Sequence, residues 1–515
     1  MEYLVMSSAQ KCQTAAEDRI SFTKKFIYGL GGLTNNLLGA AIGSMLIVLN
    51  LGLGMNPALV GLIGALPRLT DAITDPLMGY ISDNTRSKWG RRRPYIFFGA
   101  IFSGVVFALL WQVPLAQSEN FYFWFFLIGS IIFYLAYTVF ATPWVALGYE
   151  LTPDYHERTS LMAVQNFMGQ MAWLVAPWFL WFMQSDVMFD DMMEGASWLA
   201  IIIGIFAIVV GVLPAIFLKE RFTLSSEKTL EKIDNKHNAE KPEGVAAQEE
   251  FPSGLADFFK GFIATIKFSP FLRLCAATFL VFNGFMLVAS FQTYVIIYYV
   301  FSGDQALGAE YAGWSGTVSA ISTFCVIFLV TKLSAAVGKR KAFFIVTSVS
   351  IFGYGLKWFC YNPDYPLLLL VPPVFIAFGL GGLFTLMGSM VADVCDFDEL
   401  KTRQRREGMF GSIYWWVVKL GMALALAVGG FLLNATGFDV ALGGAQSADT
   451  RYMMRLVDGL IPMLSSGIAI WMIVKYPITE DRALDIRQQL EARRGKSNPV
   501  PASDADAELS VAEQR

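Results

Sequence analysis

The stretch Arg68-Leu-Thr-Asp71-Ala-Ile-Thr-Asp75-Pro76 places three ionisable side chains inside a long apolar segment. On a helix, Arg68, Asp71 and Asp75 share one face because they stand at positions i, i+3 and i+7. A charged group at the middle of a membrane is energetically costly, so it indicates a functional site by default. Two carboxylates one turn apart, beside an arginine, offer oxygen atoms to a cation. We therefore expect this stretch to bind the coupling ion of a membrane transporter.

The rest of the chain has the composition of a membrane protein. Of its 515 residues, 55% are hydrophobic and only 16% are charged, and apolar segments recur along the whole length. Apolar runs of about 18 residues or more are long enough to cross a bilayer. We expect an all-α membrane protein with twelve transmembrane helices. The predicted spans are residues 23–50, 57–82, 94–114, 121–149, 158–184, 196–218, 268–301, 310–334, 341–360, 366–394, 406–433 and 451–475.

The charges between these spans predict their orientation. One set of loops is basic and contains Arg86, Lys88, Arg91, Arg92, Arg93, Arg158, Lys339, Arg340, Lys341, Lys401, Arg403, Arg405 and Arg406. The loops that alternate with them are acidic or neutral and contain Glu119, Asp186, Asp190, Asp191, Glu194, Asp304, Glu310 and Asp364. Short basic loops face the cytoplasm under the positive-inside rule. The pattern predicts a plasma-membrane protein (inner membrane in a bacterium) with both termini in the cytoplasm.

The spans fall into two groups of six, separated by a charged segment. The predicted parts are a cytoplasmic N-terminal segment (1–22), an N-terminal half (23–218), a cytoplasmic linker (219–267), a C-terminal half (268–475) and a largely disordered cytoplasmic tail (476–515). Residues 251–267 of the linker have the composition of a helix that lies at the membrane interface. We expect one short helix in the tail.

The basic loops of the two halves have similar sequences. Gly90-Arg-Arg-Arg93 follows the second span, and Gly338-Lys-Arg-Lys341 follows the eighth. Residues 150–158 after the fourth span and 393–406 after the tenth both run from acidic to basic. Two pseudo-symmetric six-helix halves with a site between them are the architecture of the major facilitator superfamily.

Further polar groups lie at the expected depth of the acidic pair. With a rise of about 1.5 Å per residue, Asp71 lies about 18 Å and Asp75 about 12 Å from the basic end of their span. Side chains near the same level are Asn35, Asn36, Thr138, Gln170, Trp173, Asn283 and Lys419. A bilayer core is about 30 Å thick, so these groups cluster near its middle, as the lining of one cavity would. Trp415 precedes Lys419 by one turn, and an aromatic face beside a lysine suits a sugar ring.

Several of these residues have a structural alternative. Asn35 and Asn36 can bond neighbouring helices, which is a common role of asparagine in membranes. Thr138 can bond the backbone of its own helix, and Lys357, near the outer end of the ninth span, is expected to reach toward the interface.

The acidic pair also has an alternative interpretation, as an internal salt bridge with Arg68 and Lys419. Two buried carboxylates on adjacent turns repel each other unless a cation or a proton is shared, which favours the cation site.

Six motifs extend through both halves: Arg68-x-x-Asp71-Ala-Ile-Thr-Asp75-Pro76-x-x-Gly79, Thr85-Arg-Ser-Lys-Trp-Gly90-Arg-Arg-Arg-Pro94, Pro143-Trp-x-Ala-Leu147, Glu150-Leu-Thr-x-Asp154-Tyr-x-Glu157-Arg158-Thr159, Val391-Ala-Asp393-x-x-Asp396-x-Asp398-Glu399 and Lys419-x-Gly421. They resemble the motifs of the glycoside–pentoside–hexuronide:cation symporters of the major facilitator superfamily. The resemblance covers most of the membrane domain but neither the linker nor the tail.

The resemblance, together with the depth pattern, implies a role for each candidate residue. The cation site comprises Asp71, Asp75, Thr74 and Thr138. The substrate site comprises Asn35, Asn36, Arg68, Ala141, Asn166, Gln170, Trp173, Asn283, Trp415 and Lys419, and Lys419 lies near both sites. The cytoplasmic gating networks comprise Asp83, Arg91, Arg92, Glu150, Arg158, Asp393, Asp396 and Arg406.

The chain departs from melibiose permease, a member of that family, mainly at the sugar site. Two acidic sugar ligands are replaced by Asn36 and Ala141, an arginine by Asn166, and an asparagine that supports sodium binding by Thr74. Galactosides are therefore disfavoured. An anionic saccharide such as a uronide fits the free charge of Lys419, a neutral glucoside or pentoside stays open, and so does the choice between Na⁺ and H⁺.

We predict a cation-coupled secondary active symporter that imports a saccharide, glycoside or uronide by alternating access, with Na⁺ or H⁺ as the coupling ion. The alternatives are a cation-coupled carrier of lysolipids or other amphiphiles and a membrane sensor that does not transport. We expect no enzymatic activity, no cofactor and no metal beyond Na⁺ at Asp71 and Asp75. The expected partners are a small-molecule substrate and membrane lipid, with no nucleic acid and no obligate protein partner.

Overall fold

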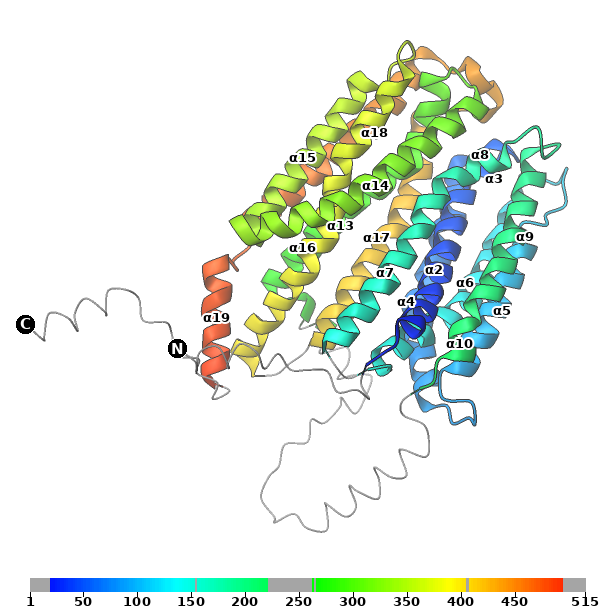
Figure 1. Cartoon of the computed structure of the whole chain (residues 1–515). Coiled ribbons are helices and arrows are strands. Elements are labelled where there is room, and N and C mark those ends of the chain that lie inside the picture. Colours follow the sequence, from blue (N-terminus) through cyan, green and yellow to red (C-terminus); the bar gives the residue numbers. More distant parts are fainter. Residues whose placement is uncertain (1–18, 153–154, 221–261, 264, 404–406, 494–515) are drawn as a thin grey trace, which may run out of the picture.

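The computed structural model describes residues 19–152, 155–220, 262–263, 265–403 and 407–493. Over these residues the chain is a bundle of long helices (Figure 1). Most of the predicted linker and the end of the tail lie outside the described residues, so the boundaries predicted there remain predictions.

The first six predicted spans all correspond to helices, three of which are interrupted or extended by short segments. The helices are α2 (Phe22–Met45), α3 (Ile47–Leu51), α4 (Pro57–Asn84), α5 (Arg93–Leu110), α6 (Glu119–Glu150), α7 (Tyr155–Val175), η1 (Ala176–Trp178), α8 (Phe179–Met183), α9 (Met192–Gly211) and α10 (Leu213–Phe217). The short helices α3, α8 and α10 continue α2, α7 and α9.

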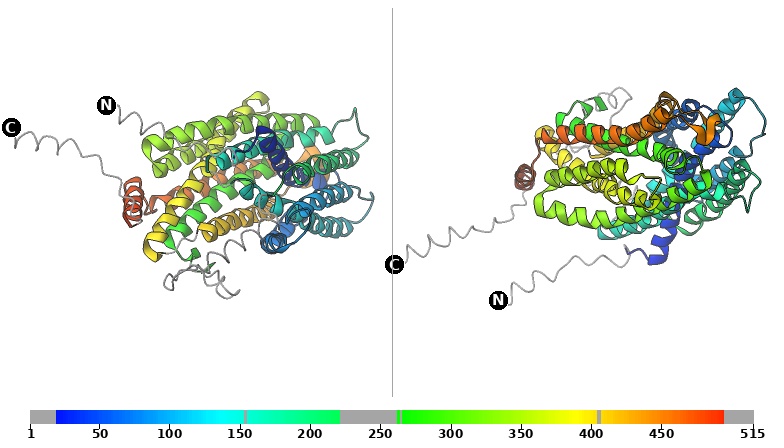
Figure 2. Two further views of the ribbon diagram at one scale, coloured as in Figure 1. Left: turned by 60° about the horizontal axis from the view of Figure 1, so that its bottom comes forward. Right: turned by 90° about the horizontal axis from the view of Figure 1, so that it is seen from above.

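The last six predicted spans are helical as well. The helices are α13 (Ser269–Val295), η2 (Ile296–Val300), α14 (Gln305–Val337), α15 (Lys339–Cys360), η3 (Pro366–Leu370), α16 (Val371–Thr402), α17 (Glu407–Ala435) and α18 (Ala448–Val474). The short tail helix is α19 (Glu480–Arg493). It packs on α16 through the buried side chains Ile486 and Leu490. In both views of Figure 2, α19 lies beside the C-terminal half, away from the blue helices.

Within the described part of the chain, ten helices are long and apolar enough to cross a membrane. The predicted second and fifth spans are the helix α4 and the series α7, η1 and α8, which carry more polar residues. The chain is an all-α, multi-pass membrane protein.

The ends of the bundle differ in chemistry, and we name them by their loops. The basic side holds the loop from Thr85 to Arg92 and Gly338, and the acidic side holds residues 112–118 and 184–191. On the acidic side, helices begin with side-chain caps that bond the free N–H groups of the first turn. Ser118, Asp191, Asp304 and Ser447 supply these caps for α6, α9, α14 and α18.

The buried apolar side chains show where the two halves are joined. One core cluster contains residues of both halves near the acidic side, among them Met55 and Met183 of the first half and Val295 and Ile297 of the second. Toward the basic side the cores are separate. One cluster there, around Trp144, belongs to the N-terminal half, and another, around Phe410, belongs to the C-terminal half.

Polar contacts also join the halves from the middle of the bundle to the acidic side. Trp178 Nε1 donates to Thr317 Oγ1 at 2.9 Å, and Gln184 Nε2 donates to Gln305 Oε1 at 3.1 Å. Asn434 Nδ2 donates to Asn56 Oδ1 at 2.5 Å. Hydrogen bonds of this kind supplement packing between membrane helices.

Helices α4 and α17 cross closely because glycines face each other's backbones. A Cβ atom at Gly61 would lie 2.6 Å from the carbonyl oxygen of Leu426, and one at Gly430 would overlap the carbonyl of Pro57. Small residues at such interfaces let two helix backbones approach. This contact places α17 of the C-terminal half directly against the acidic stretch of α4.

We predict that Gly61→Ala destabilises the protein, because backbone atoms rather than a flexible side chain occupy the space of the new methyl group. Overpacking of this kind costs about 1–3 kcal/mol, which should lower the midpoint of thermal unfolding by roughly 2–5 °C. Tryptophan fluorescence during heating of the purified protein measures this midpoint.

The matched control is Gly467→Ala on α18, where no atom lies within 4 Å of the added Cβ. Its midpoint should stay unchanged or rise slightly. Equal midpoints for the two variants would contradict the close crossing of α4 and α17.

Candidate functional site

Arg68, Asp71 and Asp75 lie along one face of α4, as their spacing predicted. The helix also contains Pro67 and Pro76, which flank this segment. The Asp71 residue is buried with 7% of its surface exposed, whereas the Asp75 side chain is 30% exposed. The two carboxylates therefore differ in their access to solvent.

Asp75 is the more fully bonded of the two carboxylates. Its Oδ2 forms an ion pair with the ammonium group of Lys419 on α17, which crosses from one half of the bundle to the other. Its Oδ1 accepts hydrogen bonds from Thr138 Oγ1 at 3.2 Å and Thr142 Oγ1 at 3.3 Å, both on α6. Thr74 reaches this group only indirectly, through a 3.5 Å contact between its hydroxyl and that of Thr138.

Asp71 lies beside this cluster and is less fully hydrogen-bonded than Asp75. Among the described residues, no donor reaches its Oδ1. A buried polar atom without a partner costs roughly 1–3 kcal/mol, so native proteins rarely keep one without a function. The neighbouring Arg68 Nη1 contacts Met422 Sδ at 3.7 Å, and its guanidinium lies 5.6 Å from the centre of the Tyr134 ring.

The formal charges of this group balance. Arg68 and Lys419 contribute +2, and Asp71 and Asp75 contribute −2, so the group is neutral without any added ion. One bound Na⁺ or H⁺ would raise the sum to +1. The arrangement brings five oxygen-bearing side chains to one place, and hard cations prefer oxygen ligands. The side chains gathered here are therefore of the kind that binds a hard cation.

A second polar group links α2 to α6 near the acidic pair. The hydroxyl of Tyr137 donates to Asn35 Oδ1 at 2.8 Å, and Asn35 Nδ2 donates to Asn36 Oδ1 at 3.2 Å. Asn36 lies against Gly169 of α7, where a Cβ would be 2.5 Å from its Nδ2. Asn35 thus bonds a neighbouring helix, which is the packing role that the sequence left open.

The other predicted substrate residues lie on α6, α7, α13 and α17. Asn166 and Trp173 on α7 are exposed, and Gln170 between them is partly buried. Trp415 on α17 is 56% exposed and stacks on Phe384 with a ring separation of 6.2 Å.

Two of the predicted substrate residues are less accessible to a bound substrate. Asn283 Nδ2 donates to the carbonyl of Phe279 in its own helix at 2.7 Å. Ala141 on α6 is partly buried and directly precedes Thr142 in the chain.

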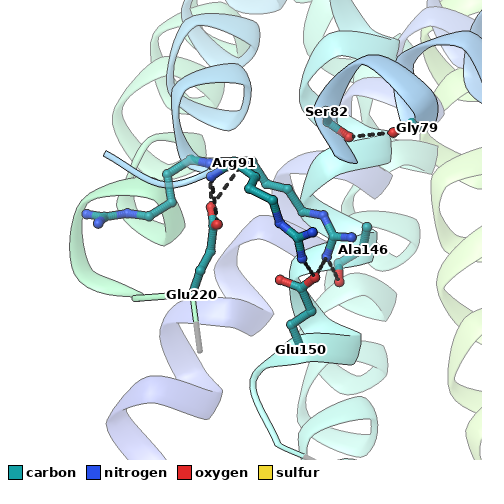
Figure 3. A network of polar contacts seen from close by, with 8 residues as sticks. Gly79, Ser82, Arg91, Ala146, Glu150 and Glu220 are labelled. Carbon is teal, nitrogen blue, oxygen red and sulfur yellow. Dashed lines mark hydrogen bonds and ion pairs between the residues drawn. The ribbon is translucent and has the colours of Figure 1, made fainter. Parts of the chain in front are cut away.

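The predicted gating residues are partly brought together on the basic side (Figure 3). Arg91 and Arg92 both pair with Glu150 at the end of α6, with Arg92 Nη1 2.9 Å from Glu150 Oε1. In the other half, Asp393 pairs with Lys339 at 2.7 Å, and Asp396 lies one turn further along α16.

The remaining gating predictions are not tested by these contacts. The side chains of Asp83 and Arg158, and the whole of Arg406, lie outside the described residues.

One expectation was wrong. Lys357 does not extend to the interface but lies buried at 3% exposure, paired with Asp458 of α18 at 2.7 Å. The partner stands 101 residues away in the sequence, so the spacing within one span could not reveal it.

Sequence reasoning also missed several residues of the site. Thr142 follows Thr138 by four residues, and this helical spacing is a signal that was available. Tyr137 and Lys339 acquire their partners only through tertiary contacts. Glu220 accepts hydrogen bonds from the backbone N–H groups of Arg91, Arg92 and Arg93, a contact that no sequence pattern suggested.

The sequence is similar to those of several symporters and transporters. The chain is 22% identical over 480 residues to the isoprimeverose transporter of Lactiplantibacillus pentosus, which covers 92% of each chain. It is 22% identical to the putative glycoside/cation symporter YagG of Escherichia coli, over 95% of this chain and 99% of that protein. It is 23% identical to the sodium-dependent lysophosphatidylcholine symporter 1 of Gallus gallus, over 97% and 94% of the two chains.

Solved structures share the fold at low sequence identity. The inward-open xylose transporter XylE from Escherichia coli superposes with a TM-score of 0.59 and 15% identity, over 91% of this chain and 99% of that one. A bacterial homologue of the lysosomal transporter Spinster gives a TM-score of 0.58 at 15% identity, over 93% and 100% of the two chains. The model of the family described as MFS/sugar transport protein matches residues 27–480. The chain belongs to this family of the major facilitator superfamily.

Proposed function

We propose that this protein is a secondary active symporter that couples the import of a saccharide, glycoside or uronide to the entry of Na⁺ or H⁺. The observation that carries the proposal is the ion pair between Asp75 and Lys419, which joins the two halves beside the partly unbonded carboxylate of Asp71. The relatives named as glycoside/cation symporter and isoprimeverose transporter support the same class of cargo.

In this proposal, Lys419 acts as an internal competitor of the coupling ion. Its ammonium neutralises Asp75 as long as no cation is bound. An entering cation takes oxygen ligands from Asp75 and Asp71, and the hydroxyls of Thr138 and Thr142 complete its coordination. Lys419 is then released from Asp75 and can meet the cargo. Enclosing a charge without a partner in a low-dielectric interior is costly, so the protein closes only when both charges have new partners.

Charge balance bears on the class of cargo. The group formed by Arg68, Asp71, Asp75 and Lys419 is neutral, and one coupling cation gives it a net charge of +1. An anionic saccharide such as a uronide would restore neutrality in the closed state. The exposed ring of Trp415, one turn from Lys419, offers a flat apolar surface to the face of a sugar ring.

The proposed orientation indicates the side to which the carrier is open. With the basic side in the cytoplasm, as the loop charges predict, the core cluster shared by both halves closes the outer side. The separate cores of the two halves then lie at the cytoplasmic side. This arrangement fits a carrier that has opened to release its cargo inward.

A lysolipid or other amphiphile is the second candidate cargo. The lysophosphatidylcholine symporter of Gallus gallus supports it, and so do the adjacent exposed rings of Trp415 and Trp416. Uptake of saccharides and of a lysolipid into the same proteoliposomes, with and without a Na⁺ or H⁺ gradient, distinguishes the two candidates. It also distinguishes transport from binding alone.

We predict that Asp71→Asn abolishes cation-driven accumulation of the cargo, because the substituted amide carries no charge for the cation to neutralise. Accumulation should fall to the equilibrium level, a loss of at least roughly tenfold. Uptake into proteoliposomes under a cation gradient measures it.

The control for this substitution is Asp186→Asn in an exposed loop of the acidic side, which should accumulate the cargo normally. If the Asp71→Asn protein still concentrated the cargo against its gradient, the assignment of the cation site would be wrong.

We further predict that Thr142→Val weakens cation binding more than Thr74→Val does. Thr142 donates directly to Asp75, whereas Thr74 contacts only the hydroxyl of Thr138. Loss of one ligating hydroxyl should raise the apparent dissociation constant of the cation roughly fivefold to tenfold. The stabilisation of the purified protein against heat at increasing cation concentration measures this constant. An equal or larger effect of Thr74→Val would show that the cation binds nearer to Thr74.

A further inference from the structure

The carboxylate of Glu220 is bound by three successive backbone N–H groups at the start of α5. Its Oε2 accepts from Arg91 N at 2.7 Å, and its Oε1 accepts from Arg92 N at 2.8 Å and Arg93 N at 3.1 Å (Figure 3). The residue is 5% exposed. Hydrogen bonds from N–H groups to a carboxylate are stronger than neutral ones, and the start of a helix favours a negative charge.

Gly90 makes room for this carboxylate. Its φ angle is +108°, a conformation that residues with a side chain rarely adopt. A Cβ at this position would lie 2.5 Å from Oε1 of Glu220. Glycine is therefore required here for its backbone angle and also for the space that it leaves.

The bound carboxylate fixes the backbone from which the gating arginines extend. Arg91 and Arg92 leave this backbone toward Glu150 at the end of α6, and Arg92 Nη1 also donates to the carbonyl of Ala146 at 2.6 Å. Arg93 extends the other way, and its Nε donates to the carbonyl of Ala215 in α10 at 2.6 Å. The loop between α4 and α5 is thus joined to the ends of α6 and α10.

The C-terminal half has a corresponding glycine loop, although among the described residues no backbone N–H group donates to its glutamate. Gly338 has a φ angle of +80°, and a Cβ there would lie 2.5 Å from Oε2 of Glu480. Lys339 pairs with Asp393 at 2.7 Å, and Arg340 donates to the carbonyl of Val474 at the end of α18.

The two carboxylates stand at matching places in the two halves. Glu220 follows the last membrane helix of the first half, and Glu480 follows the last membrane helix of the second. They differ in burial, since Glu480 is exposed. The repetition of a positive-φ glycine, a basic run and a following glutamate in both halves argues against a chance contact of one loop.

We infer that Glu220 and Glu480 are paired positioning residues for gating, one in each half. Glu220 binds the backbone of its glycine loop, and Glu480 lies against the glycine of its own loop. In each half the adjoining basic residues thereby meet an acid of the fourth helix, Glu150 in one half and Asp393 in the other. Each half then moves as a unit when the carrier changes the side to which it opens. The inference rests on the proposed symport by alternating access.

Double-mutant cycles test the inference within and between halves. Glu220→Gln replaces one acceptor oxygen by an amide that faces a backbone N–H group. Combined with Glu150→Gln, it should lower the midpoint of thermal unfolding by less than the sum of the two single effects, because the residues act as one unit. Combined with Asp393→Asn of the other half, it should give the full sum. Glu480→Gln should combine less than additively with Asp393→Asn and additively with Glu150→Gln. Its coupling should be smaller than that of Glu220→Gln because Glu480 is exposed.

A second measurement separates positioning from stability alone. Under identical gradients, Glu220→Gln should reduce the turnover per folded carrier roughly fivefold or more, with the dissociation constant of the cargo unchanged, while Asp186→Asn keeps normal turnover. Gly90→Ala should reproduce the loss and add little to that of Glu220→Gln. If Glu220→Gln does not fold, Glu220→Asp enters the same cycles.

The outcomes are distinct. Additive effects on the unfolding midpoint within each half would refute the coupling. Normal turnover of Glu220→Gln would show that Glu220 has only a structural role and would refute the gating role. If the unsubstituted protein transported no cargo, the proposed function would fail, whereas the thermal cycles would still decide the coupling.

Discussion

The ion pair between Asp75 and Lys419 is the interaction on which the rest of the molecule depends. It links α4 to α17, and through them the N-terminal half to the C-terminal half. The helical spacing predicts that it lies near the middle of the bilayer, where charge is most costly. The close crossing of the two helices at Gly61 and Gly430 brings the ammonium within reach of the carboxylate. In the proposed cycle, this neutral pair lets the halves stay together without a bound ion and makes their separation depend on the binding of one.

The distribution of the cores explains how such a switch can move the whole molecule. The halves share a buried apolar cluster toward the acidic side and keep separate clusters toward the basic side. Well-packed interiors shift between discrete arrangements rather than deform continuously. In the proposed cycle, each half therefore rocks as a body about the central site, and the glycine loops with Glu220 and Glu480 tie the helix ends of each body together.

Much of this architecture could be predicted from the sequence because it depends on local properties. All twelve predicted spans are helical, and for ten of them the length of the apolar segment is enough to indicate a membrane crossing. The shared face of Arg68, Asp71 and Asp75 follows from helical spacing. Contacts between distant helices could not be predicted in this way. The partner of Lys357, Asp458, is an example. The ion pair between Asp75 and Lys419, by contrast, is the internal salt bridge that the sequence offered as the alternative interpretation of the acidic pair.

The central claim is that Lys419 competes with the coupling cation for Asp75, and a measurement of cation affinity in two backgrounds tests it most directly. In the otherwise unchanged protein, Lys419→Gln should lower the apparent dissociation constant of the cation by roughly tenfold, because removing a positive charge near the site is worth at least about 1.4 kcal/mol. In the Asp75→Asn background the same substitution should change little. An equal effect in both backgrounds, or weaker cation binding after Lys419→Gln alone, would contradict the claim.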